Sequence, residues 1–337
     1  MRPKVSLLVP VYNVSSFIEK CAHSLFNQTF SDIEFVFVND ATPDDSIEKL
    51  IQVINQYPER KSQVKIINHS FNRGLAAARN TAIDNSTGEY ISVVDSDDYI
   101  EPNMIEELYN KAIEENSDIV ISDFIKDYGK KRVIVNDFIS KDKEINIHHM
   151  IINDISYAYL WNKLVRRELY ERKDCRVPEG LNYLEDRHVM TRLYFYANKI
   201  SKVDKAFYHY VQYNNESISS NKDEMHFENV IRFSNLLDDF LKENHLYEKY
   251  LDITSLSKLE QKAKLMFETP KQKVRKKYAN IFKEEEKEKK YFHQLKKGYK
   301  LMLLLIRYKL FFLTHLYRQM LLLRNKISTT FFPQYSY

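Results

Sequence analysis

The chain has 337 residues, of which 44% are hydrophobic, which is enough for one large core or two smaller ones and too much for a disordered chain. Its two cysteines, Cys21 and Cys175, form no CxxC pair, so neither a disulfide framework nor a zinc site is expected. Residues 258–337 contain 20 Lys and Arg against 6 Asp and Glu and carry +14, which leaves −10 for residues 1–257 and predicts an anionic partner for the tail.

The first 125 residues alternate short apolar runs with helical patterns, which is typical of an α/β fold with a mostly parallel sheet flanked by helices. We expect Ser15 or Ser16 to cap the first helix. The expected strands are 4–11, 33–39, 64–69, 89–94 and 118–124, and the expected helices are 15–28, a segment starting at Asp44 or Asp45, 74–85 and 102–115.

The rest of the chain is less regular and ends in helical segments. From Met225 onward the pattern is helical, and residues 271–297 are rich in Lys and Glu without a firm apolar stripe, as in a solvated helix or a connector. Between residues 126 and 220 we expect a β-ribbon at 132–139, short helices at 161–169 and 184–197, and a strand at 203–211.

Acidic residues follow two of the predicted strands. Asp40 ends the second strand, and the stretch SVVDSDDYIEP (92–102) ends the fourth. Because ligands of such sheets bind beyond the carboxyl ends of the strands, both groups should face one crevice. Taken alone, SVVDSDDYIEP is either a solvated strand end with Asp98 or Ser96 as a helix cap, or a cradle for a divalent cation. No GxGxxG or GxxxxGK[ST] motif occurs, which argues against a dinucleotide site and a P-loop.

Several motifs in a fixed order carry a family resemblance. They are VPVYN (9–13), VNDATPDDS (38–46), NRGLAAARN (72–80), VVDSDD (93–98), WNKL (161–164), LED (184–186) and FYHYVQYNNESIS (207–219). In these motifs the chain resembles the family 2 glycosyltransferases over roughly residues 3–220. The resemblance implies a GT-A fold and transfer of a sugar, with inversion, from a nucleotide diphosphate donor.

The resemblance assigns a nucleotide site. Pro10 and Tyr12 correspond to the base pocket, and Asp40 to the carboxylate that accepts from the N3–H of the base, which favours a UDP-sugar. Arg79 would point towards ribose or diphosphate, where a guanidinium suits oxyanions. The alternatives are packing for Tyr12, a helix cap for Asp40 and a salt bridge with a neighbouring Asp for Arg79. Gly74 would allow a tight turn before the alanines.

The resemblance also implies a divalent metal cofactor, Mn²⁺ or Mg²⁺. Asp95 and Asp97 correspond to the DxD motif, with Asp95 near the ribose and Asp97 on the metal that bridges the diphosphate. Asp98 assists the metal or caps the following helix. His209 is either a third metal ligand or a packed strand histidine.

The resemblance places the acceptor side of the reaction at LED and WNKL. It makes Asp186 the general base that takes the proton of the acceptor hydroxyl, with Glu185 positioning the acceptor or orienting Asp186. The alternative is that both residues only open a helix, whose dipole stabilises them. Trp161 either stacks on an acceptor sugar or is a core residue. The chain has Val211 where relatives often have Arg, and Lys163 and Gln212 are candidate replacements.

We expect three parts: a glycosyltransferase domain at 1–220, a helical charged extension at 221–297 and a basic amphipathic tail at 298–337. The tail has no Asp or Glu after residue 300 and no apolar run of the ~20 residues that span a bilayer. This pattern favours an interfacial helix on an anionic membrane surface; the alternatives are packing on the domain and a dimer contact. Nucleic acid is not an expected partner.

The N-terminus has no signal-peptide pattern, so we expect a cytoplasmic protein, peripheral on the inner face of the cell membrane. There it would glycosylate a glycan or a polyprenyl-diphosphate-linked acceptor in surface-polysaccharide biosynthesis. QxxRW, the motif of processive members, is absent. The alternatives are a nucleotidyltransferase and a catalytically degenerate protein that binds a nucleotide-sugar or a partner.

Overall fold

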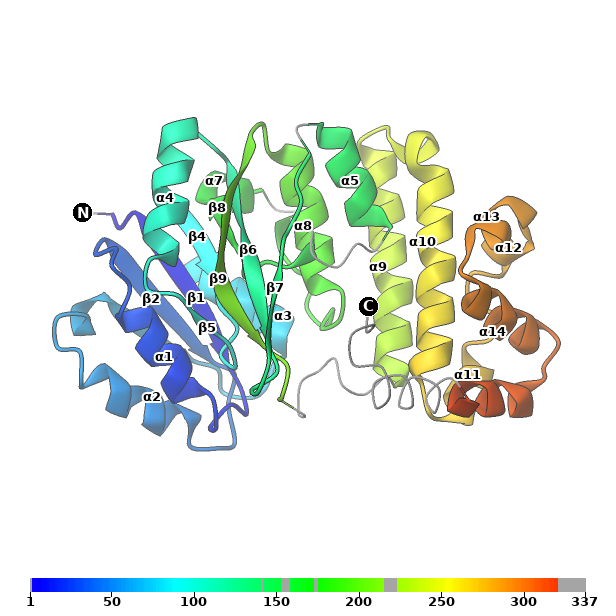
Figure 1. The fold of residues 1–337 in the computed structure, drawn as a ribbon, viewed down its shortest axis with the longest axis horizontal. Coiled ribbons are helices and arrows are strands. Elements are labelled where there is room, and N and C mark those ends of the chain that lie inside the picture. The colour runs from blue at the N-terminus through cyan, green and yellow to red at the C-terminus, as the bar shows by residue number, and fades with distance from the viewer. Residues whose placement is uncertain (1, 141, 153–157, 173–174, 215–222, 321–337) are drawn as a thin grey trace. The chain divides into compact units, whose positions relative to one another are not determined.

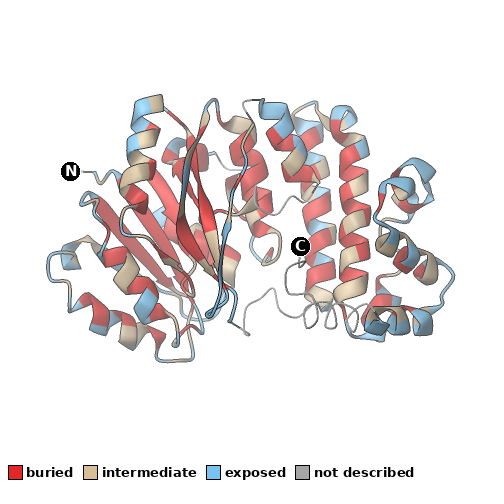
Figure 2. Ribbon diagram, viewed as in Figure 1, coloured by how far each residue is buried: buried red, intermediate tan, exposed pale blue. Residues whose placement is uncertain are grey.

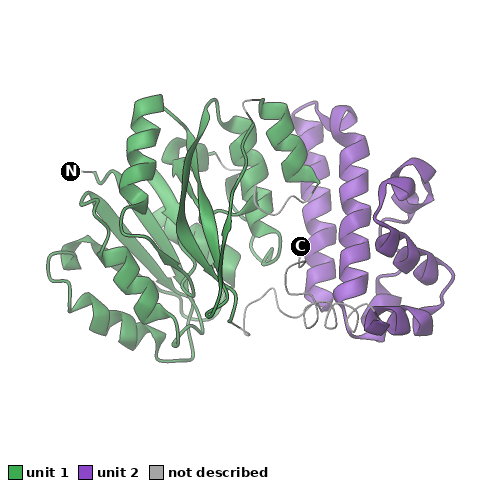
Figure 3. Ribbon diagram, in the orientation of Figure 1, with its two compact units in different colours: residues 1–215 green, residues 216–337 purple. Residues whose placement is uncertain are grey.

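The structure, a computed structural model, describes residues 2–140, 142–152, 158–172, 175–214 and 223–320. These residues belong to two units, residues 1–215 and 216–337, which Figure 3 shows in different colours. The first unit contains every residue that we expected at the nucleotide, metal and acceptor sites. Residue 220, where we placed the end of this domain, lies outside the described residues.

Within the described part of the first unit, nine strands form one sheet in the order β3-β2-β1-β4-β8-β6-β9-β5, with β7 paired to β6. Strands β1, β2, β3 and β4 are parallel to their neighbours in this group, while β8 runs antiparallel to both β4 and β6. The strands are β1 (Val5–Val11), β2 (Ile33–Asn39), β3 (Val64–Asn68), β4 (Tyr90–Val93), β5 (Tyr99–Ile100), β6 (Ile119–Asp127), β7 (Arg132–Val135), β8 (Lys163–Arg166) and β9 (Ile200–Val211).

Helices cover the sheet on two faces (Figure 1). Apolar residues of α1, α2 and α4 share one core with alternate residues of β1 and β2, and α3 packs against the same two strands from the other face. All seven residues of β1 are buried, as expected for a central strand covered on both sides. The helices are α1 (Ile18–Phe26), α2 (Ser46–Ile54), α3 (Leu75–Asn85), α4 (Met104–Glu115), α5 (Lys143–Ile151), α7 (Arg167–Tyr170) and α8 (Glu185–Tyr196), with a 3-10 turn, η1 (Lys61–Gln63).

Two local predictions were wrong, the first of them in part. The segment predicted as a helix at 161–169 is helical only from Arg167, where α7 begins, and its residues 163–166 form strand β8, which is hydrogen-bonded to both β4 and β6. Helix α1 begins at Ile18 and has no side-chain cap. Ser15 instead hydrogen-bonds to the loop before α2, where its backbone N–H donates to Asp44 Oδ2 at 2.8 Å.

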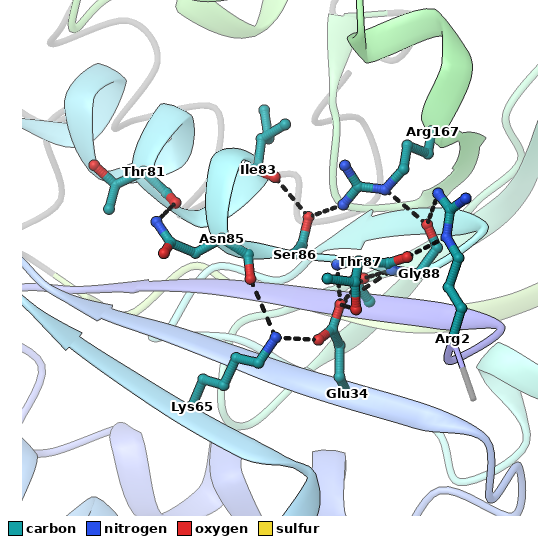
Figure 4. A network of polar contacts seen from close by, with 11 residues as sticks. Arg2, Glu34, Lys65, Thr81, Ile83, Asn85, Ser86, Thr87, Gly88 and Arg167 are labelled. Carbon is teal, nitrogen blue, oxygen red and sulfur yellow. Dashed lines mark hydrogen bonds and ion pairs between the residues drawn. The ribbon is translucent and has the colours of Figure 1, made fainter.

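A polar network joins the N-terminal ends of the parallel strands (Figure 4). Buried Glu34 accepts hydrogen bonds from Ser6 Oγ at 2.6 Å and from Lys65 Nζ at 2.8 Å. Burial alone would raise the pKa of Glu34, but these hydrogen bonds lower it, so the carboxylate stays charged. Gly88 fits here because an added Cβ would lie 2.5 Å from Ser6 Oγ. A polar cavity of about 370 Å³ opens at the same end of the sheet, beside Arg167.

The described residues of the second unit are helical. Helix α9 packs along α10, and Figure 2 shows a buried stripe on each. Most residues of the segment 271–297 are exposed, but some anchor it: buried Arg275 donates to Thr269 O at 2.6 Å, and Lys262 pairs with Glu286 at 2.5 Å. The helices are α9 (Glu224–Glu243), α10 (Tyr247–Glu268), α11 (Gln272–Lys277), α12 (Lys283–Lys287), α13 (Lys289–Gln294) and α14 (Lys297–Arg307), followed by a helical segment at 311–320.

Candidate active site

Two of the predicted nucleotide-binding residues follow adjacent parallel strands. Tyr12 follows β1 and Asp40 follows β2, and the backbone N–H of Asp40 donates to Val11 O at 3.0 Å. The ring of Tyr12 is 45% exposed and is therefore available to a ligand. Pro10 lies inside β1, paired with Val38, so it shapes the strand end with its backbone and offers little side-chain surface.

Asp40 holds the turn that precedes α3. Its carboxylate is 3% exposed and accepts from His69 Nδ1 at 2.7 Å, from the N–H of Arg73 at 2.8 Å and from the N–H of Gly74 at 2.7 Å. Gly74 has φ of +86° and lies so close to Asn182 that a Cβ would stand 2.6 Å from its side chain. Asp40 does not act as a helix cap. A carboxylate has about four acceptor positions, and these hydrogen bonds fill three of them.

Arg79 of α3 joins three of the predicted site carboxylates. Its guanidinium donates to Asp95 Oδ1 at 2.9 Å and to Glu185 Oε1 at 2.8 Å, and it also contacts Asp186 Oδ1. Burial would lower the pKa of Arg79, which is 3% exposed, but the carboxylates raise it. The alternative that we left open, a salt bridge to a neighbouring Asp, is therefore correct, and a contact with ribose or diphosphate stays a prediction. The arrangement places one guanidinium among three carboxyl groups.

Asp186 has the electrostatic surroundings of a proton acceptor. It lies in the first turn of α8, where the helix dipole favours a negative charge, and its side chain is 19% exposed. Burial raises its pKa, Arg79 opposes this shift, and Glu185 and Asp95 add to it. A carboxylate with a raised pKa is a stronger base than an ordinary one, and the fraction of it that is ionised grows as the pH rises.

Asp98 joins the acidic turn to the last strand of the sheet. Its carboxylate is 2% exposed and accepts from Tyr208 Oη at 2.8 Å and from the N–H of Val211 at 2.7 Å. Helix α4 begins only at Met104, with Asn103 as its cap residue, so Asp98 does not cap it. Asp98 therefore binds β9 through these two hydrogen bonds. Neither of our two interpretations, a residue that assists the metal or a helix cap, had included this contact.

Asp97 lies in the same turn and is less occupied. Its Oδ2 accepts from Asn214 Nδ2 at 2.8 Å, and its pKa is raised by burial and by the charge of Asp95. In the described part of the chain, no three His, Cys, Asp or Glu side chains are gathered as a preformed metal site. Asp95 and Asp97 do fit a hard cation chemically, because they are neighbouring carboxylates whose mutual repulsion a divalent ion would relieve.

His209 does not join this cluster. Its ring stacks on Tyr99 at a centroid distance of 4.1 Å, and its Nε2 lies 2.6 Å from Glu101 Oε1. Burial lowers the pKa of His209, which favours the neutral form. The structure therefore agrees with the packed strand histidine and does not bring His209 into the cluster with Asp97.

Trp161 is a core residue. It is 2% exposed, and its indole stacks against Tyr159 at 4.4 Å and Tyr208 at 4.3 Å between ring centroids. Phe124 adds an edge contact at 4.9 Å. These aromatic neighbours leave no exposed ring face for a sugar, so the structure supports the alternative that we gave for Trp161.

The sequence analysis missed two residues of the site. His69 fixes Asp40 from one side, with its other ring nitrogen 2.9 Å from Thr81 Oγ1. Asn214 contacts Asp97 from the end of the chain's first unit. A signal existed for His69, since it directly follows β3 and therefore lies at the same strand ends as Asp40. A signal also existed for Asn214, since it lies within the motif at 207–219 that carries the family resemblance.

A mostly parallel sheet flanked by helices, with acidic side chains at its strand ends, is the arrangement of the GT-A fold. Crystal structures support this fold: that of S. aureus TarS 1–349 in complex with UDP-GlcNAc has a TM-score of 0.59 at 20% identity, over 91% of this chain and 92% of that one. The chain belongs to glycosyltransferase family 2, whose model, "Glycosyl transferase family 2", matches residues 6–173. The fold, family and enzyme class predicted from the sequence are confirmed.

Two curated relatives come from Bacillus subtilis (strain 168). The chain is 36% identical to the "Uncharacterized glycosyltransferase EpsJ" over 217 residues, which cover 62% of this chain and 61% of EpsJ. It is 34% identical to the "Putative glycosyltransferase EpsH" over 255 residues, which cover 74% of this chain and 72% of EpsH. The match thus leaves more than a third of EpsJ uncovered.

Proposed function

We propose that this glycosyltransferase transfers a sugar, non-processively and with inversion, from a UDP-sugar to an acceptor hydroxyl. The observation that carries the proposal is the Arg79 cluster, in which Asp186, with its raised pKa, shares one guanidinium with Asp95 of the acidic turn. Such sharing brings a candidate base next to a candidate donor site. The TarS complex with UDP-GlcNAc supports a uridine donor for the same fold.

The base of the nucleotide would bind between Tyr12 and Asp40. Tyr12 offers an exposed aromatic face for stacking. The remaining acceptor position of Asp40 would take the N3–H of uracil, a donor that cytosine lacks. His69 and the backbone of residues 73 and 74 hold this carboxylate in one orientation. Binding of the base therefore costs little further conformational entropy at Asp40.

Asp95 and Asp97 would hold Mn²⁺ or Mg²⁺. When bound, the ion neutralises charge on the departing diphosphate and so makes it a better leaving group. The residues of the chain do the rest. Asp186 takes the proton from the acceptor hydroxyl, whose oxygen forms a bond to the anomeric carbon. The bond from that carbon to the diphosphate oxygen breaks on the opposite side, and UDP leaves with the bonding electrons.

Glu185 would act on this step through Arg79. Both carboxylates contact the same Nη1 atom of the guanidinium, so Glu185 restricts where that nitrogen can lie and thereby orients Asp186. A single base with in-line attack inverts the anomeric carbon, whereas retention needs a nucleophile on the other face of the sugar.

The first test measures UDP release from a panel of UDP-sugars, with Mn²⁺ and with EDTA. We expect release from one sugar, its loss in EDTA, and a fall of about 10²-fold or more in Asp97→Ala, because the leaving charge is then less well neutralised. The matched control is Asp204→Ala, an aspartate whose side chain is 86% exposed on β9. Release that survives EDTA would contradict metal dependence. Tight UDP binding without release from any sugar would favour the alternative, a degenerate binding protein.

We further propose that the tail contacts an anionic membrane surface, where a polyprenyl-diphosphate-linked acceptor or a glycan would be modified. None of the helices in the described ranges combines the length and hydropathy that a bilayer crossing requires. Residues near the end of the described chain nevertheless expose apolar surface: Tyr308 is 69% and Phe312 is 74% exposed. Lys309 is exposed between them, and aromatic and basic side chains together suit the headgroup region.

Vesicle co-sedimentation checks this contact. We expect the protein to bind vesicles that contain phosphatidylglycerol, more weakly at high salt, and hardly at all vesicles of pure phosphatidylcholine. The double variant Tyr308→Ser, Phe312→Ser should bind about tenfold more weakly or worse, because it lacks two apolar side chains whose transfer from water into the membrane is favourable. Ile113→Ser, at a 50% exposed apolar residue of α4, is the control. Equal binding of all three proteins would exclude the tail as the contact.

A further inference from the structure

The hydroxyl group of Tyr208 joins the two ends of the acidic turn. This turn, residues 95–98, is closed by a hydrogen bond from the N–H of Asp98 to Asp95 O at 3.0 Å. At its first residue, the N–H of Asp95 donates to Tyr208 Oη at 3.0 Å. At its last residue, Asp98 Oδ2 accepts from Tyr208 Oη at 2.8 Å. One side chain of the distant strand β9 thus holds both ends of the turn that contains Asp97.

The hydrogen-bond partners decide where the hydroxyl proton of Tyr208 points. A backbone N–H can only donate, so Tyr208 Oη must accept at Asp95, and its own proton goes to Asp98 Oδ2. The other oxygen of Asp98 accepts from the N–H of Val211 at 2.7 Å. Removing the hydroxyl would therefore leave the N–H of Asp95 and one oxygen of buried Asp98 without this partner.

The ring of Tyr208 is itself held firmly. It is 0% exposed and stacks on the indole of Trp161 at 4.3 Å between ring centroids. Its backbone lies inside the sheet, paired with Phe124 of β6 on one side and with Ile100 of β5 on the other. The hydroxyl is therefore presented to the acidic turn by the packed interior of the sheet and not by a surface loop.

The hydroxyl leaves the oxygens that would face a cation available. Asp95 Oδ1 accepts from Arg79 Nη2 at 2.9 Å, while no residue in the described ranges donates to its Oδ2. Tyr208 donates neither to Asp95 nor to Asp97, so it does not compete with a cation for them. Groups that orient metal ligands without touching the metal typically change metal affinity by about 10–100-fold when they are removed. Tyr208 has the place of such a group.

We propose that Tyr208 is a positioning residue that holds Asp95 and Asp97 in the arrangement that binds the divalent cation. The inference deepens the proposed function and rests on the metal site proposed there. Without the hydroxyl, the N–H of Asp95 is no longer attached to β9, and Asp98 keeps only its bond to Val211. The turn then has more conformations open to it, and a cation that binds must restrict them at a cost in affinity.

Titration of Mn²⁺ into the complex of the protein with UDP, followed by the EPR signal of free Mn²⁺, tests this role. We expect Tyr208→Phe to bind Mn²⁺ about 10–100-fold more weakly than the wild type. In EDTA, calorimetry should show unchanged affinity for UDP. Sugar transfer should need correspondingly more Mn²⁺, and kcat should recover towards the wild-type value at saturating Mn²⁺. A general loss of structure would instead lower kcat at every Mn²⁺ concentration.

The matched control is Tyr90→Phe, which also removes a buried hydroxyl group. Tyr90 is 0% exposed, begins β4 at the end away from the acidic turn, and donates to Ser117 O at 3.1 Å. This variant should bind Mn²⁺ like the wild type. The proposal is wrong if Tyr208→Phe keeps the wild-type affinity for Mn²⁺, or if both variants lose it to the same extent.

A second variant decides the question if Tyr208→Phe does not fold. In Asp98→Asn, the single carbonyl oxygen cannot replace both carboxylate oxygens that β9 binds, so the turn loses one of its two attachments at this residue. Mn²⁺ binding should again weaken, and unchanged binding would contradict the proposal. A wild-type protein that binds UDP but no Mn²⁺ would refute the proposed metal dependence instead, which separates the two failures.

Discussion

Replacing Asp186 with Asn is expected to lower kcat by about 10²–10⁴-fold at neutral pH, with little change in the donor KM. The amide has nearly the same shape but cannot accept the proton of the acceptor hydroxyl. Steady-state UDP release with an acceptor measures the loss, and UDP calorimetry shows whether the nucleotide still binds. Unchanged kcat would remove Asp186 from the role of base.

Glu185→Gln is the control for this variant, because Glu185 contacts the same guanidinium nitrogen but is assigned only an orienting part. Its kcat should fall less than that of Asp186→Asn. The sign of the pH effect follows from the raised pKa of Asp186: the base must be ionised, so kcat should rise with pH, above the ordinary carboxyl range. This rising limb should be absent in Asp186→Asn.

Replacing Arg79 with Met should lower the free energy of unfolding by about 3–5 kcal/mol, because it removes the one partner shared by Asp95, Glu185 and Asp186. Denaturant unfolding of both proteins measures the difference. Arg176→Met is the control, since Arg176 pairs with the exposed Asp84 and donates to Tyr170 O, so its replacement should cost less than that of Arg79.

The loss in Arg79→Met should also depend on pH. Arg79 opposes the raised pKa of Asp186, so without the guanidinium that pKa should rise still further above its unfolded value. Protonation of Asp186 then favours the folded state, so the variant should recover stability as the pH falls and lose it as the pH rises through the raised pKa. A deficit that is the same at all pH values would mean that the ionisation of Asp186 does not depend on Arg79.

Prediction from the sequence was most accurate for elements whose local residue pattern alone determines their secondary structure. Strands β1 and β2 are continuous apolar runs that stay buried on both faces, and their observed limits lie within about one residue of the prediction. Strand β8 has only four residues and lies in a segment with a helical pattern. Its strand conformation depends on hydrogen bonds to β4 and β6, which are distant in the sequence, so no local signal revealed it.

The same limit applies to the site. The motifs named Asp95 and Asp186 separately, but only the packing of α3 near α8 shows that Arg79 contacts both. Spacing alone did not separate the roles of Asp97 and Asp98 either, because the difference comes from β9, which offers hydrogen-bond donors to Asp98. Which partners a charged side chain finds is a property of the three-dimensional fold.

The contacts of Asp98 also bear on the order in which the protein can mature on the ribosome. Val211 and Tyr208, which hold its carboxylate, follow it by 113 and 110 residues, and Tyr208 Oη also accepts from the N–H of Asp95 at 3.0 Å. A nascent chain that has released only its first 200 residues contains every strand of the N-terminal half and still lacks these partners. The acidic turn can therefore take its final shape only after β9 has emerged, so a translation product cut short before residue 208 would contain the aspartates without the structure that holds them in place.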